Sequence, residues 1–379
     1  MSFLRTTCIL LAACAALAIV ASGAALAGCA AAQAGSTTAH RAAAARVVWP
    51  ARTILAEPSS LGIVSQVVDP RTKTDFALTS GAHGSFTLRR TALAGGQVKI
   101  GPSFPVGSIA SANGSLWVFG ARATGKSAVL RLYRVNPRTL HVELVRKLGP
   151  FPGASGEAAL ASGTHGTIWV SFARTVVHLN ARTGARIASA MVPVGLIAGD
   201  IALSPSGRFL YVATSPPRGG GHAPVFEYGT AGLRKLAVNK KTVIAANVGG
   251  GTLTAAPGGV WVAARAGMEG RTVLLRHSDL RSVRLPGAGS PHGLYSWTMW
   301  ESTAYSSPSL YLSTYPLQGR GAVAACVSPT TGQVRARGSV AGHREVDALL
   351  SIGQHGRVLY AAVPHGIIAI SPPPACRTN

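Results

Sequence analysis

The stretch 157–192, EAALASGTHGTIWVSFARTVVHLNARTGARIASAMV, decides the fold of this chain of 379 residues. It divides into EAALASG, TIWVSFA, TVVHLNARTG and ARIASAMV, four short apolar segments separated by turn residues. Alternation with a period of two residues between such turns is typical of antiparallel strands. The next unit repeats the order as DIALSPSG, RFLYVATS, PVFEYGT and LRKLAV. Both units therefore predict small four-stranded sheets.

An aromatic residue recurs within a short apolar segment along the whole chain. The seven copies, which we call the anchors, are Phe76, Trp117, Trp169, Tyr211, Trp261, Tyr311 and Tyr360. Periods of about 40–50 residues built from short strands are typical of propeller blades. We predict an all-β fold, a seven-bladed β-propeller of four-stranded blades, with the anchors in the seams between blades rather than in a ligand cage. Tandem β-sandwiches are the alternative, although they require no fixed anchor period.

One unit carries a more specific pattern. Residues 176–184 (VVHLNARTG), 200–207 (DIALSPSG) and 210–214 (LYVAT) together resemble the YVTN-type propeller repeat, which is related to NHL and quinoprotein-like propellers. The resemblance implies a multi-bladed propeller over about residues 46–376, and it implies no particular reaction. The chain has no vicinal cysteine pair and no repeated blade-end tryptophan motif, which argues against a quinone cofactor.

The two ends of the repeat region predict how the ring closes. After Tyr360 there is room for one more strand, residues 366–370, before the run Pro372-Pro373-Pro374. The last blade therefore lacks its outer strand. We expect the segment 46–55 to supply that strand, because an unpaired sheet edge leaves backbone groups without partners.

The N-terminus has the pattern of an export signal. Arg5 precedes an apolar run over residues 8–27, and Leu26-Ala27-Gly28-Cys29 resembles the bacterial lipobox. The resemblance implies cleavage before Cys29, lipidation of its thiol and anchoring to the outer face of the cell membrane. We predict a signal peptide over 1–28, a flexible tether over 29–45 and one propeller domain over 46–379. An ordinary secreted protein and an uncleaved membrane anchor are the alternatives.

The cysteines agree with export. Cys8 and Cys14 lie in the signal, and Cys29 would carry the lipid. Cys326 and Cys376 remain, and a single pair in an exported chain predicts a disulfide.

The charge balance is strongly basic. The chain has 36 Lys and Arg against 12 Asp and Glu, a net charge of +24. An apolar content of 47% excludes a disordered basic tail. The Arg, Ala and Gly excess is typical of a high-GC bacterium. Export argues against nucleic acid as a partner, so we expect the membrane, an envelope protein or an anionic envelope polymer.

The few acids define one candidate site. Alignment of the first strand of each unit places Glu157, Asp200 and Asp347 at equivalent positions near the mouth of the central channel. Converging carboxylates suit a hard cation such as calcium, or general acid–base catalysis. The alternative is that these side chains cap turns, accept hydrogen bonds from backbone or pair with Arg.

A second candidate site is the long segment 285–308. It contains Tyr295, Trp297, Trp300 and Glu301, and long aromatic loops often bind partners. The alternative is that Trp297 and Trp300 belong to the first strand of the sixth blade and pack inside.

These patterns predict a monomeric, lipid-anchored envelope protein that acts as a non-catalytic binding or scaffold module without a cofactor. The alternative is a metal-dependent hydrolase or lyase with its site at the channel mouth.

Overall fold

The structure is a computed structural model. It describes residues 47–56, 62–69, 74–80, 85–90, 97–102, 108–124, 127–152, 158–216, 224–240, 253–266, 269–286, 301–314, 323–343, 346, 348–352, 357–363 and 366–378. All of these residues belong to one compact unit, Ala44–Asn379.

The described strands form seven sheets, numbered here 1 to 7, whose consecutive strands pair antiparallel. Sheet 1 contains β3 (Gly62–Val68), β4 (Asp75–Ser80), β5 (Ser85–Arg90) and β6 (Gln97–Pro102). Sheet 2 contains β7 (Ile109–Ala112), β8 (Ser115–Thr124), β9 (Ser127–Val135) and β10 (Val142–Pro152). Sheet 3 contains β11 (Ala158–Ser162), β12 (Thr167–Phe172), β13 (Thr175–Asn180) and β14 (Arg186–Met191). Sheet 4 contains β15 (Ile197–Leu203), β16 (Phe209–Ser215), β17 (Val225–Gly229) and β18 (Lys235–Asn239).

The remaining sheets complete the order. Sheet 5 contains β19 (Leu253–Ala256), β20 (Gly259–Ala266), β21 (Glu269–Arg276) and β22 (Ser282–Val283). Sheet 6 contains β23 (Glu301–Ser306), β24 (Ser309–Thr314), β25 (Val323–Val327), β26 (Val334–Val340) and β1 (Val47–Trp49). Sheet 7 contains β27 (Ala348–Ile352), β28 (Leu359–Val363), β29 (Gly366–Ile370) and β2 (Ala51–Ala56). Two 3-10 turns, η2 (Thr164–Gly166) and η4 (Pro374–Cys376), also lie in the described ranges.

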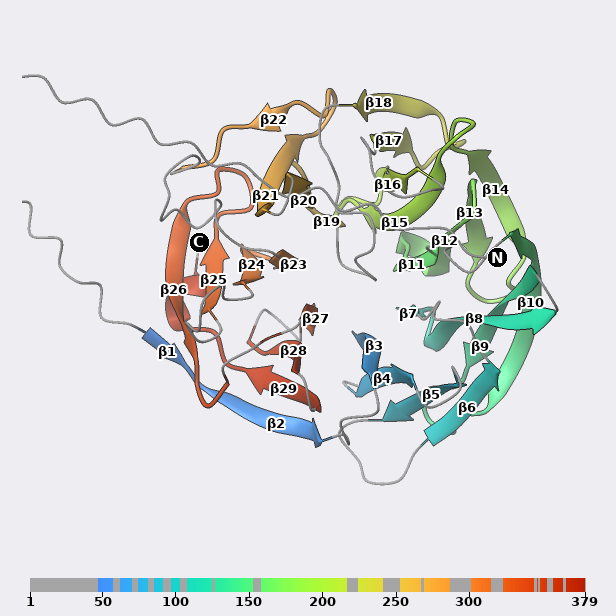
Figure 1. Cartoon of the computed structure of the whole chain (residues 1–379), viewed down its shortest axis with the longest axis horizontal. Helices are drawn as coiled ribbons and strands as arrows, with labels where there is room; N and C mark the ends of the chain where they lie inside the picture. Colours follow the sequence, from blue (N-terminus) through green and yellow to red (C-terminus); the bar gives the residue numbers. More distant parts are fainter. Residues whose placement is uncertain are drawn as a thin grey trace, which may run out of the picture. The chain divides into compact units, whose positions relative to one another are not determined.

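The sheets surround a common centre in a β-propeller arrangement (Figure 1). The first strand of each sheet lies innermost, and each inner strand contacts the inner strand of the next sheet from β3 through to β27. The strand β27 in turn contacts β3. This arrangement confirms the prediction of an all-β propeller.

The anchors occupy one equivalent position in every sheet. Each lies on the second strand and faces a third-strand residue in register; the pairs are Phe76–Arg90, Trp117–Arg134, Trp169–His178, Tyr211–Glu227, Trp261–Leu274, Tyr311–Cys326 and Tyr360–Ala369. Six of the seven anchors are fully buried, and Tyr360 is partly exposed. The repeat of the sheet therefore places each anchor at the same register position on the second strand.

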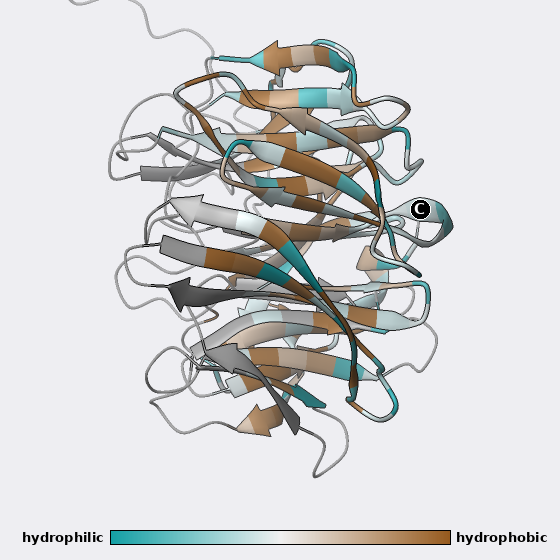
Figure 2. Cartoon of the chain, turned by 90° about the vertical axis from the view of Figure 1, so that its right-hand side faces the viewer, coloured by the Kyte–Doolittle hydropathy of each residue, from teal (hydrophilic) through white to brown (hydrophobic). Residues whose placement is uncertain are grey.

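The apolar core lies in the seams between neighbouring sheets. Each buried cluster joins two adjacent sheets; Trp117 packs with Ile168 of sheet 3, and Trp261 packs with Leu310 of sheet 6. Figure 2 shows the apolar residues concentrated within the strands and the hydrophilic residues at the turns. The anchors are thus core residues, as predicted.

Tight turns between the third and fourth strands repeat one geometry. In sheet 3 the side chain of Asn180 accepts hydrogen bonds from the backbone of Arg182 and Thr183, and Gly184 has a positive φ of 70°. Sheet 2 repeats the turn with Asn136, while Leu140 takes the left-handed conformation at φ 58°. Asn favours such turns because its side-chain oxygen accepts a hydrogen bond from the backbone N–H two residues ahead.

The N-terminal segment corrects two details of the predicted fold. We predicted one strand over 46–55 and four strands in every blade. Instead Val47–Trp49 runs parallel to β26 as a fifth strand of sheet 6, and Ala51–Ala56 runs antiparallel to β29 in sheet 7. Pro50, which has no backbone N–H to donate, separates the two strands. The side chain of Trp49 is fully buried in the seam between these sheets, which explains why the segment divides there.

Candidate functional site

The structure describes only part of the predicted site residues. Glu157 and Asp347 of the channel-mouth cluster, Cys29, and the loop residues Tyr295, Trp297 and Trp300 lie outside the described residues. Glu301 is the first residue of β23, and its side chain is outside the description. Asp200, Cys326 and Cys376 are described.

The carboxylate of Asp200 accepts backbone hydrogen bonds. It lies within the innermost strand β15, where Oδ1 accepts from its neighbour Ile201 at 2.9 Å. Oδ2 accepts from the backbone N–H of Leu253, at the start of β19 in the next sheet, at 2.8 Å. Asp200 therefore connects sheets 4 and 5, which is the structural alternative considered for this residue.

Serines make the same kind of contact elsewhere on the inner strands. Ser65 Oγ accepts from the backbone of Ile109, and Ser108 Oγ accepts from the backbone of Leu160. Each contact is a hydrogen bond between neighbouring sheets near their inner strands. Polar side chains at the inner strands therefore repeatedly connect one sheet to the next.

Replacement of Asp200 by alanine should lower the free energy of unfolding by about 1–3 kcal/mol, because the Leu253 N–H loses its acceptor in a partly buried place. Urea unfolding monitored by tryptophan fluorescence measures the effect. Ser108→Ala is the matched control for loss of one such contact. A variant at Asp200 as stable as the wild type would contradict the structural role.

The predicted disulfide is present between Cys326 and Cys376, whose Cα atoms are 5.7 Å apart. Cys326 lies on β25 and Cys376 on η4, directly after sheet 7. Both residues are fully buried beside Trp49 and Tyr311. The bond therefore joins the C-terminal end of the chain to sheet 6.

The third-strand residue that faces an anchor often reaches the next sheet. Arg90 donates to the backbone oxygens of Pro137 and Arg138, and Arg134 donates to the backbone oxygen of Arg182. Cys326 makes its disulfide from the same position. In sheets 1, 2 and 6 the residue at this position therefore contacts a neighbouring part of the ring, with different chemistry each time.

Glu227 is a fully buried acid at this position of sheet 4. Its side chain has no exposed surface, His277 Nδ1 lies 3.0 Å from Oε1, and the backbone N–H of Ser278 donates to Oε2 at 3.3 Å. The imidazole of His277 also packs against the ring of Phe209. Burial and the nearby Glu227 carboxylate raise the pKa of Tyr211 above its ordinary value. This pair joins sheet 4 to the turn of sheet 5.

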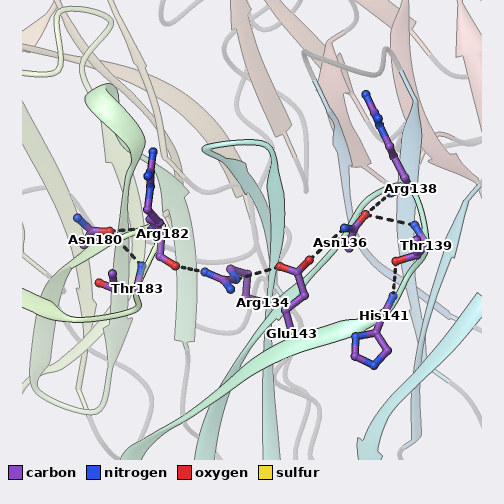
Figure 3. Close-up of polar contacts among 9 residues, drawn as sticks. All are labelled: Arg134, Asn136, Arg138, Thr139, His141, Glu143, Asn180, Arg182 and Thr183. Carbon is purple, nitrogen blue, oxygen red and sulfur yellow. Dashed lines mark hydrogen bonds and ion pairs between the residues drawn. The ribbon is translucent and has the colours of Figure 1, made fainter.

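The outer side of sheets 2 and 3 is strongly cationic. Five of its basic side chains are exposed, and we call them the cationic face: Arg138, Arg146, Lys147, Arg182 and Arg186. Residues 127–152 and 158–199 contain one acid, Glu143. Its Oε2 atom lies 3.1 Å from Arg134 Nε, and its Oε1 atom accepts a hydrogen bond from Asn136 Nδ2 (Figure 3). Both carboxylate oxygens are therefore already engaged within the fold.

A shallow groove of about 450 Å³ lies between sheets 3 and 4. Its lining includes the exposed apolar residues Met191 and Val194, the buried Tyr228, and the cations Arg174 and Lys235. Burial raises the pKa of the Tyr228 hydroxyl above its ordinary value. The groove therefore adds apolar surface on sheet 3, which also carries part of the cationic face.

Sequence reasoning missed the cationic face and the Glu227–His277 pair. The signal for the former was the near absence of acids between Val129 and Gly199. The Glu227–His277 pair joins residues 50 positions apart, and no motif marks it.

Within the described ranges, no three His, Cys, Asp or Glu side chains gather in a way that could hold a metal ion. The same part of the chain contains no helix long and apolar enough to cross a membrane.

No protein-family model matches the chain, and no curated protein matches it. Among solved structures it is similar to hydrazine synthase of Kuenenia stuttgartiensis, with a TM-score of 0.55 and 12% identity over 82% of this chain and 96% of that chain. It is also similar to a crystal structure of BBS1N in complex with ARL6DN, with a TM-score of 0.55 and 11% identity over 86% of this chain and 100% of that chain. Likeness at such identities defines the fold alone. The chain is a β-propeller protein, a class whose members serve as binding or scaffold modules as well as enzymes.

Proposed function

We propose that this protein is a cell-envelope lipoprotein, anchored through Cys29, whose propeller is a non-catalytic binding or scaffold module for an anionic polymer or protein of the envelope. The observation that carries the proposal is the unequal use of charge. The described acids are buried, hydrogen-bonded or ion-paired within the fold, whereas many of the bases face solvent.

The acids with described side chains support this reading. Asp69, Asp75 and Glu227 are buried, and Asp200 accepts backbone hydrogen bonds. Glu143 pairs with Arg134, as described above. Asp279 pairs with Arg276, and that hydrogen bond lowers the pKa of Asp279 to about 2. Exposed Arg and Lys side chains are therefore left to face a partner, and cationic surfaces attract anionic polymers most strongly at low salt.

We also infer that the seven sheets act as one closed seven-bladed ring of YVTN type. The pairing of β2 with β29 and the contact of β27 with β3 support closure. A closed ring has no free inner edge, so it suits a rigid platform whose outer strands and turns bind partners.

The anchoring is tested by fractionating cells that produce the full-length protein. We expect the wild type in the membrane fraction and Cys29→Ala outside it, because the acylated thiol is the anchor. Detection of both forms in the same fraction would contradict the lipoprotein assignment.

The binding function is tested with the full-length protein in detergent, immobilised and exposed to anionic polymers. We expect binding that weakens as salt is raised, because exposed charges are screened beyond about 10 Å at 0.1 M salt. Absence of binding to any anionic polymer or envelope extract at low salt would contradict the proposal.

Calcium separates this proposal from the metal-dependent hydrolase or lyase. We expect the same melting temperature in calcium and in chelator, because the carboxylate of Asp200 already accepts two backbone hydrogen bonds. A ligand at a hundred times its Kd would stabilise the fold by about 2.7 kcal/mol. A clear calcium-dependent rise in melting temperature, lost in Asp200→Asn, would support the enzyme instead.

A further inference from the structure

We propose that the cationic face of sheets 2 and 3 is the binding site for a phosphate-bearing polymer. The inference rests on the proposed binding function and narrows it to one surface and one chemistry. The cationic face is Arg138, Arg146, Lys147, Arg182 and Arg186, all exposed.

The first argument is local charge. Residues 127–152 and 158–199 contain eight basic side chains and one acid, Glu143. Arg134 and Asn136 occupy both oxygens of that acid, and Arg134 is only partly exposed. The single carboxylate of these ranges therefore pairs with Arg134, and it does not neutralise any of the five exposed cations.

The second argument is that two of these arginines are carried by rigid turns. Arg138 and Arg182 hold equivalent positions, two residues after Asn136 and Asn180, whose side chains accept from their backbone N–H groups at 2.9 and 2.8 Å. In Figure 3 both side chains extend away from the hydrogen-bonded network. A fixed backbone reduces the ordering that binding would require.

The two turns are also held next to each other. Arg134 of sheet 2 donates to the backbone oxygen of Arg182, and Arg146 of the same sheet donates to the backbone oxygen of Thr183 at 3.0 Å. Arg146 also packs against Gly184, where an added Cβ would lie 3.1 Å from its Cγ. These contacts bring basic side chains of sheet 2 to the turn of sheet 3 that carries Arg182.

Among the described turns between third and fourth strands, this arrangement occurs in sheets 2 and 3. The equivalent turn positions in sheets 4, 5 and 6 hold Ala231, Ser278 and Thr330. Sheets 4, 5 and 6 belong to the same basic chain but have no arginine at this turn position. The basic composition alone therefore does not explain the pair of turn arginines.

The chemistry of the ligand follows from the side chains. Guanidinium groups form paired hydrogen bonds with phosphate oxygens, and four of the five cations are Arg. The charges lie on exposed turns and outer strands, so an extended polymer engages them better than a single small anion.

The test compares two triple charge reversals of equal net change in the full-length protein. The face variant is Arg138→Glu, Arg182→Glu and Arg186→Glu, and the control variant is Arg234→Glu, Arg284→Glu and Arg337→Glu, which are also exposed. The hydrogen bonds described above for Arg138 and Arg182 use their backbone atoms, so the turns should persist. Melting temperatures verify that each variant folds.

The probe is inorganic polyphosphate in a salt titration. We expect the face variant to bind at least tenfold more weakly than the wild type, and the control variant to stay within threefold. Each lost phosphate contact should reduce the slope of log K against log salt by about 0.7, so the face variant should lose about 2.

Four results would overturn the inference. Equal weakening of the two variants would remove the site from this face and leave the binding function intact, whereas a wild type that binds no polyphosphate, no other anionic polymer and no vesicles would remove both. Equal binding of polyglutamate would overturn the phosphate chemistry. Face-dependent binding to vesicles of anionic phospholipid, with none to polyphosphate, would assign the face to the membrane.

Discussion

Replacement of Trp261 by alanine is expected to lower the free energy of unfolding by about 3–5 kcal/mol. The side chain is fully buried in the seam between sheets 5 and 6, so truncation leaves a cavity that neighbouring strands cannot fill. Its indole Nε1 also donates to the backbone oxygen of Pro329, in the turn of sheet 6, at 2.8 Å. Chemical unfolding followed by circular dichroism measures the loss.

Phenylalanine variants separate the packing effect from the hydrogen bond. Trp117 is equally buried, but its indole Nε1 has no hydrogen-bond partner in the described part of the chain. Trp261→Phe should therefore be destabilised more than Trp117→Phe, by about 1 kcal/mol. Equal effects would mean that the bond to Pro329 adds nothing to stability. A stable Trp261→Ala would contradict the assignment of the anchors to the core.

Removal of the disulfide is expected to lower the free energy of unfolding by about 4 kcal/mol, since the bond closes a loop of 50 residues in the unfolded chain. The double variant Cys326→Ser and Cys376→Ser is compared with the wild type in urea, with and without reductant. The buried surroundings of both residues add to the effect, because serine places hydroxyl groups beside Trp49 and Tyr311.

Reductant provides the control in the comparison of the wild type with the double serine variant. Reductant should lower the unfolding midpoint of the wild type and leave the double variant unchanged. A double alanine variant keeps the apolar surroundings and isolates the loss of the covalent bond. If the wild type were insensitive to full reduction of the bond, closure of the C-terminal end by the disulfide would be ruled out as a source of stability.

Local patterns in the sequence predicted most of the fold. Alternation over two residues predicted the strands of sheets 3 and 4, and the anchor period predicted which positions are buried. The turn at Asn180–Gly184 could also be anticipated, because an Asn side chain and a glycine with positive φ act within a few residues. The pairing of Cys326 with Cys376 followed from their number and the export signal.

The candidate sites were predicted less well. Asp200 lies on an inner strand, and its bond to Leu253 depends on a strand 53 residues away. Arg134 and Glu227 hold the same position in their sheets, yet one binds a backbone oxygen and the other faces a histidine. Sequence spacing carries no information about such partners, because the neighbouring sheet supplies them.

By itself, the sequence determined the strands, the turns and the period of the buried aromatic residues, because these depend on interactions between residues close in the chain. The tertiary structure alone decided how the segment after residue 46 divides between β26 and β29, and how Arg134 of sheet 2 comes to bind the turn of sheet 3. Both outcomes depend on which backbone edges and acceptors two adjacent sheets leave open. Those groups meet only when the sheets pack around the common centre.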